Sequence, residues 1–576
     1  MRTNALVQWL IFLGILIALN ILANSRFGNV ALYGRLDLTE EKRFTLTEGT
    51  RDLLRDLDEV VYVQVLLEGE MPASFKRLRL ATREILEDFR ARSTRIEFSF
   101  ENITEGDPEE VNQRTQELAQ VGIVPRQIRV QEGTEFRQQL IYPVAVVNYK
   151  GRSLPVNLLE NDNPTLDDEI DLNNSVALLE YKLANAIEKL QNPLKRNVLF
   201  TTGHGELGPR QTADLEASLN SYYNTGRLFL DSLTAIKPGV DALIIAKPTR
   251  PFSDRDKFKI DQYVMNGGKV LWLIDPLRVD LDSLSGRKDY VPVPYELELD
   301  DLLFRYGIRI EPNLVLDLQN TRIPLATGMT GDGPQLERFP YPYHVVATFD
   351  GTHPVIKGLG PVNLFYPATL DTTVRAKYPL TKTVLVESTA NTRLQYAPVR
   401  MNFEFLRYGL DEAKFNTGVQ PMGMLLEGTF SSLYENRVTD EMMAGLDSLG
   451  QPFRAQSPPN AMLVIADGDV AENPVGGPNQ EIRPLGYNPF EQYTFANKDL
   501  LMNAVEYLLD EGGIIEARGK EVRLRLLNTA KAKREKATWQ FVNIALPLVF
   551  LGLVGAGYTF WRRRRYGQPI KESHEA

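Results

Sequence analysis

The segment Gly203-His204-Gly205-Glu206 carries side chains capable of acid–base chemistry. It follows the apolar run 197–202, which predicts a buried strand, and ligands of α/β sheets bind at the carboxyl ends of such strands. His204 and Glu206 could act as an acid and a base, or help to bind a metal. The alternative is a tight turn in which the glycines supply backbone freedom and the polar groups bond locally. The segment is not a phosphate loop, because it lacks the third glycine and the lysine of those fingerprints.

Three aspartates follow two other predicted strands. Asp275 follows the apolar strand that begins at Lys269, and Asp467 and Asp469 follow the strand 461–466. Carboxylate oxygens at one sheet edge could form a cation site, although acidic residues at such edges also stabilise turns. The candidate ligand-binding residues are therefore His204, Glu206, Asp275, Asp467 and Asp469.

The rest of the composition offers little further support for catalysis. No nucleophile or second histidine lies near His204 in the sequence. The chain contains no cysteine, which excludes disulfides, thiolate metal sites and a cysteine nucleophile. No two of its four histidines have the i, i+4 spacing of metal ligands on a helix. We therefore predict no catalytic residues, no metal and no cofactor.

A parallel α/β sheet is needed to position the candidate residues. Apolar strands at 197–202, 241–246 and 269–274 alternate with helices, one of which begins at Ser253 and ends at Gly267. This alternation predicts a Rossmann-like domain over 193–515. Later segments that could complete it are strands 313–316, 422–426 and 461–466 and helix 499–509. The proline-rich stretch 276–454 is expected to form long irregular insertions.

A second α/β domain is predicted over 35–192. Thr47 can cap a short helix that carries Leu53, Leu54 and Leu57. The elements that follow are strand 60–67, helix 74–92, strand 95–100, helix 108–121, strands 127–131 and 137–149, and helix 173–190. Their order, β-α-β-α-β-β-α, is typical of a thioredoxin-like domain. Residues 68–72 contain no Cys-x-x-Cys, so this domain could serve only as a scaffold.

An uncharged apolar stretch lies near each end of the chain. Residues 5–23 and 541–561 are each long enough to cross a bilayer as a helix, at about 1.5 Å per residue. The first could instead be a cleaved signal peptide, but it is longer than a usual signal h-region. Pro547 is expected to kink or weaken the second helix. The charged segment 516–538 would either extend that helix as a juxtamembrane rod or form a solvated surface helix.

Small residues on the second apolar helix predict close packing against another helix. Gly552 and Ala556 form a small-xxx-small pair with Gly555 beside them, although membrane helices are often rich in glycine. Four arginines begin the basic tail 562–576 and indicate a cytoplasmic C-terminus, whereas basic residues on the other side of the helix argue against it. We predict a two-pass protein of the bacterial inner membrane, with both termini in the cytoplasm and the body in the periplasm.

The overall composition limits the classes of partner. With 576 residues, the chain is too long for one hydrophobic core, so several domains are expected. Its net charge of −10 argues against a nucleic-acid partner, because phosphate binding needs a basic surface.

Four parts of the sequence resemble the gliding-motility-associated ABC transporter auxiliary family of GldG. They are 37–47 (DLTEEKRFTLT), 202–206 (TGHGE), 466–470 with 484–487 (ADGDV and PLGY), and 495–500 with 503–508 (FANKDL and NAVEYL). The resemblance implies a substrate-binding or auxiliary subunit with a Rossmann-like middle domain. Its implied partners are a multispanning permease of the GldF type and a cytoplasmic ATPase of the GldA type, with two copies of the subunit in one complex as a further expectation. It implies no catalytic residues, and the sequence has no Walker motif of its own.

The leading hypothesis is therefore a non-catalytic subunit of an ABC transporter complex linked to gliding motility. Its membrane helices would pack on a permease, and its periplasmic domains would bind a ligand or partner or transmit force. Two alternatives remain open. One is a periplasmic solute receptor with its ligand near His204 and Asp467, and the other is a metal-assisted hydrolase that uses His204 and Glu206.

Overall fold

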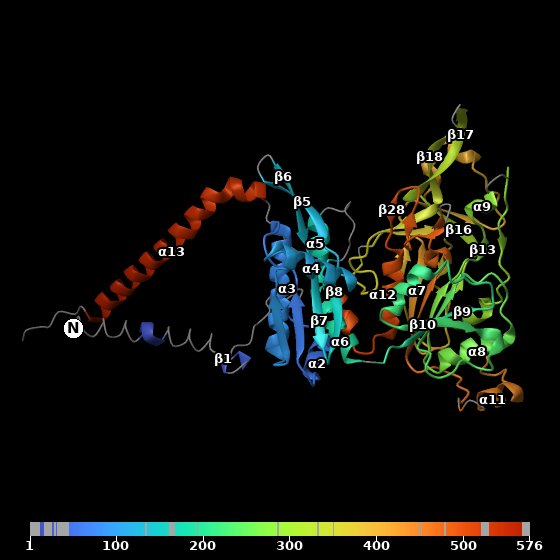
Figure 1. Cartoon of the computed structure of the whole chain (residues 1–576), viewed down its shortest axis with the longest axis horizontal. Coiled ribbons are helices and arrows are strands. Elements are labelled where there is room, and N and C mark those ends of the chain that lie inside the picture. The colour runs from blue at the N-terminus through green and yellow to red at the C-terminus, as the bar shows by residue number, and fades with distance from the viewer. Residues whose placement is uncertain are drawn as a thin grey trace, which may run out of the picture. The chain divides into compact units, whose positions relative to one another are not determined.

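The computed structural model describes most of the chain in two compact units, Met1–Val522 and Arg523–Ala576 (Figure 1). The described residues are 12–15, 26–27, 30–31, 45–132, 135–159, 168–192, 194–284, 287–330, 333–349, 351–447, 450, 452–476, 480–519 and 529–566. Of the predicted helix 5–23, residues 12–15 are described and are helical, and the rest of that prediction lies outside the described residues.

The first α/β body of unit 1 is built on a mixed four-stranded sheet in the order β4-β3-β7-β8. Strand β3 (Val61–Val65) pairs in parallel with β4 (Ile96–Phe100) and antiparallel with β7 (Val144–Tyr149), which in turn pairs antiparallel with β8 (Arg152–Asn157). Alternate residues of β3 are fully buried, as expected for a strand covered on at least one face.

Helices flank this sheet, and all but the one over Pro108–Gln120, which has no buried residue, contribute to its hydrophobic core. Thr47 caps the first of them, as predicted, by accepting a hydrogen bond from the Thr50 amide at 3.4 Å. The helices are α2 (Glu48–Arg55), α3 (Ala73–Arg92), α4 (Pro108–Gln120), α5 (Asp168–Ala177) and α6 (Leu179–Gln191). The prediction of one helix over 173–190 was therefore wrong, because the chain forms two helices that meet at Leu178.

The predicted strand 137–149 also divides into two. Its first half is β6 (Glu135–Ile141), which forms a hairpin with β5 (Arg126–Glu132), and its second half is β7 in the main sheet. Pro143 lies at the break, where a residue without a backbone N–H cannot continue a ladder. Strand β8 was missed by the sequence analysis.

The second α/β body of unit 1 contains a seven-stranded sheet in the order β10-β9-β11-β12-β24-β23-β21. The first five strands run parallel, whereas β23 and β21 are each antiparallel to their neighbours. The strands are β9 (Asn197–Thr202), β10 (Asn224–Phe229), β11 (Ala242–Ala246), β12 (Lys269–Leu273), β21 (Leu380–Glu387), β23 (Pro421–Gly428) and β24 (Asn460–Ile465).

Both faces of this sheet are buried, which explains the continuous apolar runs in the sequence. Along β11, Ala242 and Ile244 belong to one hydrophobic core, and Leu243 and Ile245 belong to another on the opposite face. Helices α7 (Ala213–Asn220) and α12 (Asn497–Leu509) contribute to the first core, and α8 (Asp254–Met265) and α10 (Asp300–Arg305) contribute to the second. Helix α8 is capped by Ser253 and ends before Gly267, as predicted.

The stretch predicted to be irregular, 276–454, contains an ordered subdomain. Strand β16 (Asn313–Asp317) does not join the large sheet as expected, because it pairs with β22 (Thr392–Tyr396) instead. A long hairpin of β17 (Asn320–Thr330) and β18 (Gly333–Ala347) is extended by β19 (Val362–Phe365). The strand predicted at 422–426 does enter the large sheet, as β23, but antiparallel to β24.

Short elements complete the described part of unit 1. The strands are β1 (Arg26–Phe27), β2 (Val30–Ala31), β13 (Leu277–Arg278), β14 (Val293–Pro294), β15 (Arg309–Ile310), β20 (Leu370–Asp371), β25 (Val475–Gly476), β26 (Glu481–Ile482), β27 (Tyr487–Asn488) and β28 (Tyr493–Thr494). The helices are α9 (Leu281–Leu284), α11 (Asp440–Asp447) and the 3₁₀ turns η1 (Leu230–Ser232), η2 (Glu404–Tyr408), η3 (Glu412–Lys414), η4 (Asp469–Ala471) and η5 (Ile514–Gly519).

After the large sheet the chain returns to the first body. Ile514, Ile515 and Ala517 of η5 are buried in the same hydrophobic core as strands β3 and β7. The predicted helix 516–538 was therefore wrong at its start, where the chain forms a 3₁₀ turn. Unit 2 contains α13 (Thr529–Tyr566), a single helix that includes the predicted apolar segment 541–561 and continues through Pro547.

Candidate functional site

Four neighbouring parallel strands present polar residues at their carboxyl ends. His204 follows β9, Lys247 follows β11, Asp275 follows β12 and Asp467 follows β24, and these strands are adjacent in the sheet. All five predicted ligand-binding residues lie at this edge. They form two separate clusters rather than one, with His204 and Glu206 in the first and the three aspartates in the second.

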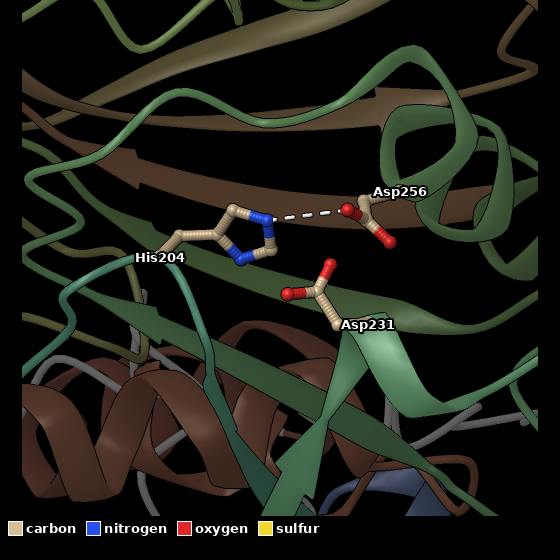
Figure 2. A group of neighbouring side chains, drawn as sticks. All are labelled: His204, Asp231 and Asp256. Carbon is tan, nitrogen blue, oxygen red and sulfur yellow. Dashed lines mark hydrogen bonds and ion pairs between the residues drawn. The ribbon is translucent and has the colours of Figure 1, made fainter.

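The first cluster surrounds the imidazole of His204 with carboxyl groups. Its Nε2 lies 3.3 Å from Oδ2 of Asp256, and its Nδ1 lies 3.7 Å from Oε1 of Glu206. Figure 2 shows His204, Asp231 and Asp256 directed toward one another from the end of β9, from η1 and from the start of α8. The ring also stacks on Phe252, with ring centroids 3.9 Å apart.

Asp256 is fixed by a buried ammonium as well as by His204. Lys259 donates to Oδ1 of Asp256 at 2.6 Å and to the Leu230 carbonyl at 2.8 Å, and the Ser253 hydroxyl donates to Oδ2 of Asp256 at 2.6 Å. Asp256 holds this position because Ser253 begins α8, which places residue 256 in the first helical turn, where acidic residues are favoured. Both carboxylate oxygens are therefore occupied.

Burial and charge determine the protonation of this cluster. His204 is 3% exposed, and burial alone disfavours its charged form. The carboxylates of Glu206 and Asp256 outweigh that effect and raise the pKa of His204 above its ordinary value. Burial opposes ionisation of Asp256 too, but hydrogen bonds from Lys259 and Ser253 lower its pKa. The group is thus stabilised as an imidazolium between carboxylates.

Asp231 is the third group that could share a metal with His204 and Asp256. One ligand atom from each of the three residues lies within 4.8 Å of the others, and Asp231 is exposed. A nitrogen and two carboxylates are plausible ligands for a divalent transition metal. However, both oxygens of Asp256 already accept hydrogen bonds, so the ammonium of Lys259 supplies the positive charge that a metal would supply.

The second cluster contains a lysine that the sequence analysis did not select. Nζ of Lys247 contacts a carboxylate oxygen of Asp469 and lies 3.7 Å from Oδ2 of Asp275 and 3.6 Å from Oε2 of Glu472. Burial opposes the charge of Lys247, but the surrounding carboxylates outweigh it and raise its pKa. The acidic residues that could have held a cation are therefore already matched to an ammonium.

Asp467 has a structural role at the centre of the same edge. It is fully buried, and its carboxylate accepts hydrogen bonds from the backbone amides of Phe365 at 2.7 Å, Asp469 at 2.8 Å and Val470 at 3.2 Å. Burial and the nearby Asp275 raise the pKa of Asp467. This carboxyl group thereby connects the end of β24 to β19 and starts η4.

The backbone at Lys247 explains how its side chain reaches the acidic cluster. Its φ of +52° is in the left-handed region, which residues with a Cβ adopt at a cost. A Cβ on the neighbouring Gly468 would lie 2.7 Å from Cβ of Lys247, so only glycine fits beside it. The sequence signal was weak because Lys247-Pro248 resembles an ordinary turn.

Comparison with known proteins identifies the family to which this chain belongs. A family described as "ABC-type uncharacterized transport system" matches residues 195–504, more than half of the 576 residues. The chain belongs to this family. A second match, to a domain of unknown function named DUF7088, covers residues 40–148 of the first α/β body.

Three further proteins to which this ABC-type transport family member is similar share 19% sequence identity or less with it. An uncharacterized protein of Borreliella burgdorferi is 19% identical over 531 residues, which cover 90% of each chain. Among solved structures, the mmIFT52 N-terminal domain is 12% identical with a TM-score of 0.29, and the match covers 54% of this chain and 96% of that one. A ThuA-like protein from Parabacteroides merdae is 11% identical with a TM-score of 0.24, covering 58% and 94%.

The transport family member also presents the predicted helix-packing residues on α13. Among the described residues, one helix, over Arg534–Arg565, is long and apolar enough to cross a membrane, and none of its apolar window is buried. A Cβ placed on Gly552 or Gly555 would meet no atom within 4 Å, and Ala556 is exposed. These features are consistent with association with a membrane.

Proposed function

We propose that this chain is a non-catalytic accessory subunit that anchors an ABC transporter assembly through α13. The observation that carries the proposal is the family match over residues 195–504 in a chain that also has a membrane-compatible helix. Both polar clusters at the sheet edge support the non-catalytic part. His204 is buried against Phe252, and the acidic cluster encloses Lys247, so burial shields both groups from a substrate.

The proposed assembly contains a multispanning permease of the GldF type and a cytoplasmic ATPase of the GldA type, and it is linked to gliding motility. Gly552, Gly555 and Ala556 would form the face of α13 that packs on the permease, because small residues allow close helix approach. We place the α/β bodies in the periplasm and both termini in the cytoplasm, in line with the arginines at 562–565. Two copies of the subunit per complex are part of the proposal.

We further propose a thioredoxin-like scaffold for the first body and a Rossmann-like domain for the second. The strand order β4-β3-β7-β8, with β3 parallel to β4 and antiparallel to β7, supports the first assignment. Five adjacent parallel strands covered by helices on both faces support the second. Neither body would need a catalytic site to bind a partner or to transmit force.

Capture of the tagged chain from solubilised membranes tests the assembly. The expected result is co-purification of a multispanning membrane protein and an ATPase. The triple variant Gly552→Leu, Gly555→Leu and Ala556→Leu should abolish co-purification of both proteins, because the bulkier side chains prevent close helix packing. The matched control is Val554→Leu, which lies on the opposite face at 100° per residue and is exposed. Recovery of the wild-type chain alone would refute the assembly.

The solute-receptor alternative receives less support at the predicted position. A ligand near His204 and Asp467 would have to enter a region where both side chains are buried. It would also have to displace the bonds that Lys247 and Lys259 make to the carboxylates. We therefore do not place a ligand at this sheet edge.

A further inference from the structure

A cavity of about 400 Å³ lies where the two α/β bodies of unit 1 meet. Residues of α6 and β8 line it from the first body, and residues after α7 and along α12 line it from the second. Ile514 and Ile515 of η5 complete the lining. This volume is within the usual range of small-molecule sites, which are commonly found between domains. None of the candidate residues at the carboxyl edge of the sheet lines it.

The basic side chains of the cavity already have partners. Lys189 lies 2.9 Å from Oε1 of Glu506 and 3.8 Å from the ring centre of Tyr222. The other cations donate to backbone carbonyls, with Arg152 bound to Leu190, Lys195 to Asn220 and Arg196 to Leu509. An anionic ligand would therefore find no unpaired cation among the described lining residues.

Two of the three acidic side chains that line the cavity have hydrogen-bond or ion-pair partners, and the third does not. Glu506 contacts Lys189, Tyr181 and Asn185, and Asp510 accepts hydrogen bonds from the Ile514 and Ile515 amides at 3.3 and 3.0 Å. The carboxylate of Glu188 makes no hydrogen bond or ion pair with any described residue, although Asp510, Glu506, Lys189 and Arg196 are near enough to affect its charge. Its carboxylate is the one acidic charge of the described lining that is left unmatched.

The electrostatic environment agrees with this geometry. Burial raises the pKa of Glu188 to about 7, and the nearby Asp510 and Glu506 add to the effect. The protein thus keeps a carboxyl group where its negative charge costs free energy. A cation bound beside Glu188 would remove that cost, whereas a bound anion would increase it. Tyr223, buried at the same wall, has a hydroxyl group with no hydrogen-bond partner among the described residues and could bond to a ligand.

We propose that this cavity binds a small organic amine, with its ammonium group on Glu188 and its apolar or aromatic body against Tyr222 and Tyr223. Aromatic faces attract cations, as the contact of Lys189 with Tyr222 illustrates within the same cavity. The volume favours an organic amine over a bare metal ion, which would need several converging oxygen ligands. The inference goes beyond the proposed function, because it concerns the isolated chain and needs no permease.

Occupancy of the cavity would stabilise the contact between the two bodies. A ligand there would touch Tyr181 and Glu188 of the first body and Tyr222 and Tyr223 of the second. It would also touch η5, the last described element before α13. A bound amine would thus favour one arrangement of unit 1 by the difference in its affinity for that arrangement over others.

The test is calorimetric titration of the full chain in detergent at pH 8.5, with tyramine as the probe. The matched compounds are 4-ethylphenol, which lacks the ammonium group, 4-hydroxyphenylacetate, which carries a carboxylate, and calcium chloride. We expect tyramine to bind, and the other three to bind at least tenfold more weakly or not at all. Equal binding of tyramine and 4-ethylphenol, or binding of calcium alone, would overturn the proposal, and so would the absence of binding by tyramine.

Two variants locate the site. Glu188→Gln should weaken tyramine binding on the order of tenfold, because it removes a charged hydrogen-bond partner. Glu84→Gln, at an exposed position in the middle of α3, is the matched control and should bind as the wild type does. Ser221→Trp should abolish binding by filling the cavity from an exposed position, so the fold is expected to tolerate it. Unchanged affinity in both Glu188→Gln and Ser221→Trp would refute the site, whatever the outcome of the permease capture.

Discussion

The two ends of strand β9 lie in very different surroundings. At its carboxyl end, His204 is buried beside Glu206 and Asp256, and Asp256 is paired with Lys259. At its amino end, Arg196 lines an open cavity in which the carboxylate of Glu188 has no partner among the described residues. Both regions are rich in titratable groups. At the carboxyl end the buried carboxylates have charged or hydrogen-bonding partners, whereas in the cavity the Glu188 carboxylate has none among the described residues.

The comparison predicts opposite effects of removing charge at the two ends. In the His204 and Lys247 clusters, which we call the closed clusters, each charged group offsets the charge of its neighbours. Removing one group therefore leaves the opposite charge buried without a partner, at the full cost of desolvation. In the cavity, removing the charge of Glu188 relieves a cost instead. Unfolding of the full chain in detergent measures both effects, and the fluorescence of Trp272, which is buried in β12, reports on the large sheet.

The largest effect is expected for Lys247→Met. This change keeps the length of the side chain but leaves Asp275, Asp469 and Glu472 without their shared ammonium. Breaking a buried ion pair on one side costs about 3–5 kcal/mol, so urea unfolding should show a large loss of stability. The control is Lys76→Met at an exposed position of α3, which should change stability by about 0.5 kcal/mol or less. If Lys247→Met loses no more stability than the control does, the acidic cluster needs no cation.

A smaller, pH-dependent effect is expected for His204→Phe. Phenylalanine can still stack on Phe252, but the contacts with Asp256 and Glu206 are lost, at a cost of about 2 kcal/mol at pH 6. The folded state raises the pKa of His204, so its contribution is complete below the unfolded pKa and disappears as the pH rises through the folded pKa. The stability difference between wild type and variant should therefore shrink between pH 6 and pH 9. A difference that grows with pH would contradict the imidazolium assignment.

The effect of Glu188→Gln should be smaller still and opposite in sign. The folded chain raises the pKa of Glu188 from 4.5 to about 7, so the folded state binds more protons in that range and wild-type stability falls as the pH rises through it. The groups facing Glu188 are Glu506, Asp510, Arg196, Lys189 and Tyr223. The variant should be more stable than wild type by about 1 kcal/mol at pH 8.5 and equal to it near pH 4. A destabilised variant at pH 8.5 would mean that Glu188 has a partner.

Local patterns in the sequence were sufficient for the buried parallel strands. The runs at 197–202, 241–246 and 269–274 match β9, β11 and β12 to within one residue, because both faces of these strands are apolar and turns bound them. Thr47 and Ser253 were likewise identified as helix caps from their side chains. The partners of β16 and the direction of β23 could not be predicted, since strand pairing depends on contacts far apart in the sequence.

The site was predictable in position but not in composition. The rule that polar residues gather at the carboxyl ends of parallel strands placed all five candidates at one edge. It did not reveal Lys247, Asp256 or Asp231, which come from a turn, the first turn of a helix and a 3₁₀ turn. Asp256 resembles the acidic residue that commonly begins a helix, so nothing in the sequence distinguished its contact with His204. Glu188 was not identified either, because its isolation depends on which neighbours the fold supplies.

The smallest effect expected is the coupling between the two ends of β9. Six residues at about 3.3 Å each separate them by roughly 20 Å, and His204 and Glu188 share no partner among the described residues. Effects at such distances usually add to within about 0.5 kcal/mol. The double variant His204→Phe with Glu188→Gln should therefore show the sum of the two single changes at pH 8.5. A larger coupling energy would mean that the strand transmits the state of the cavity to the closed cluster, and the two regions would then act as one unit.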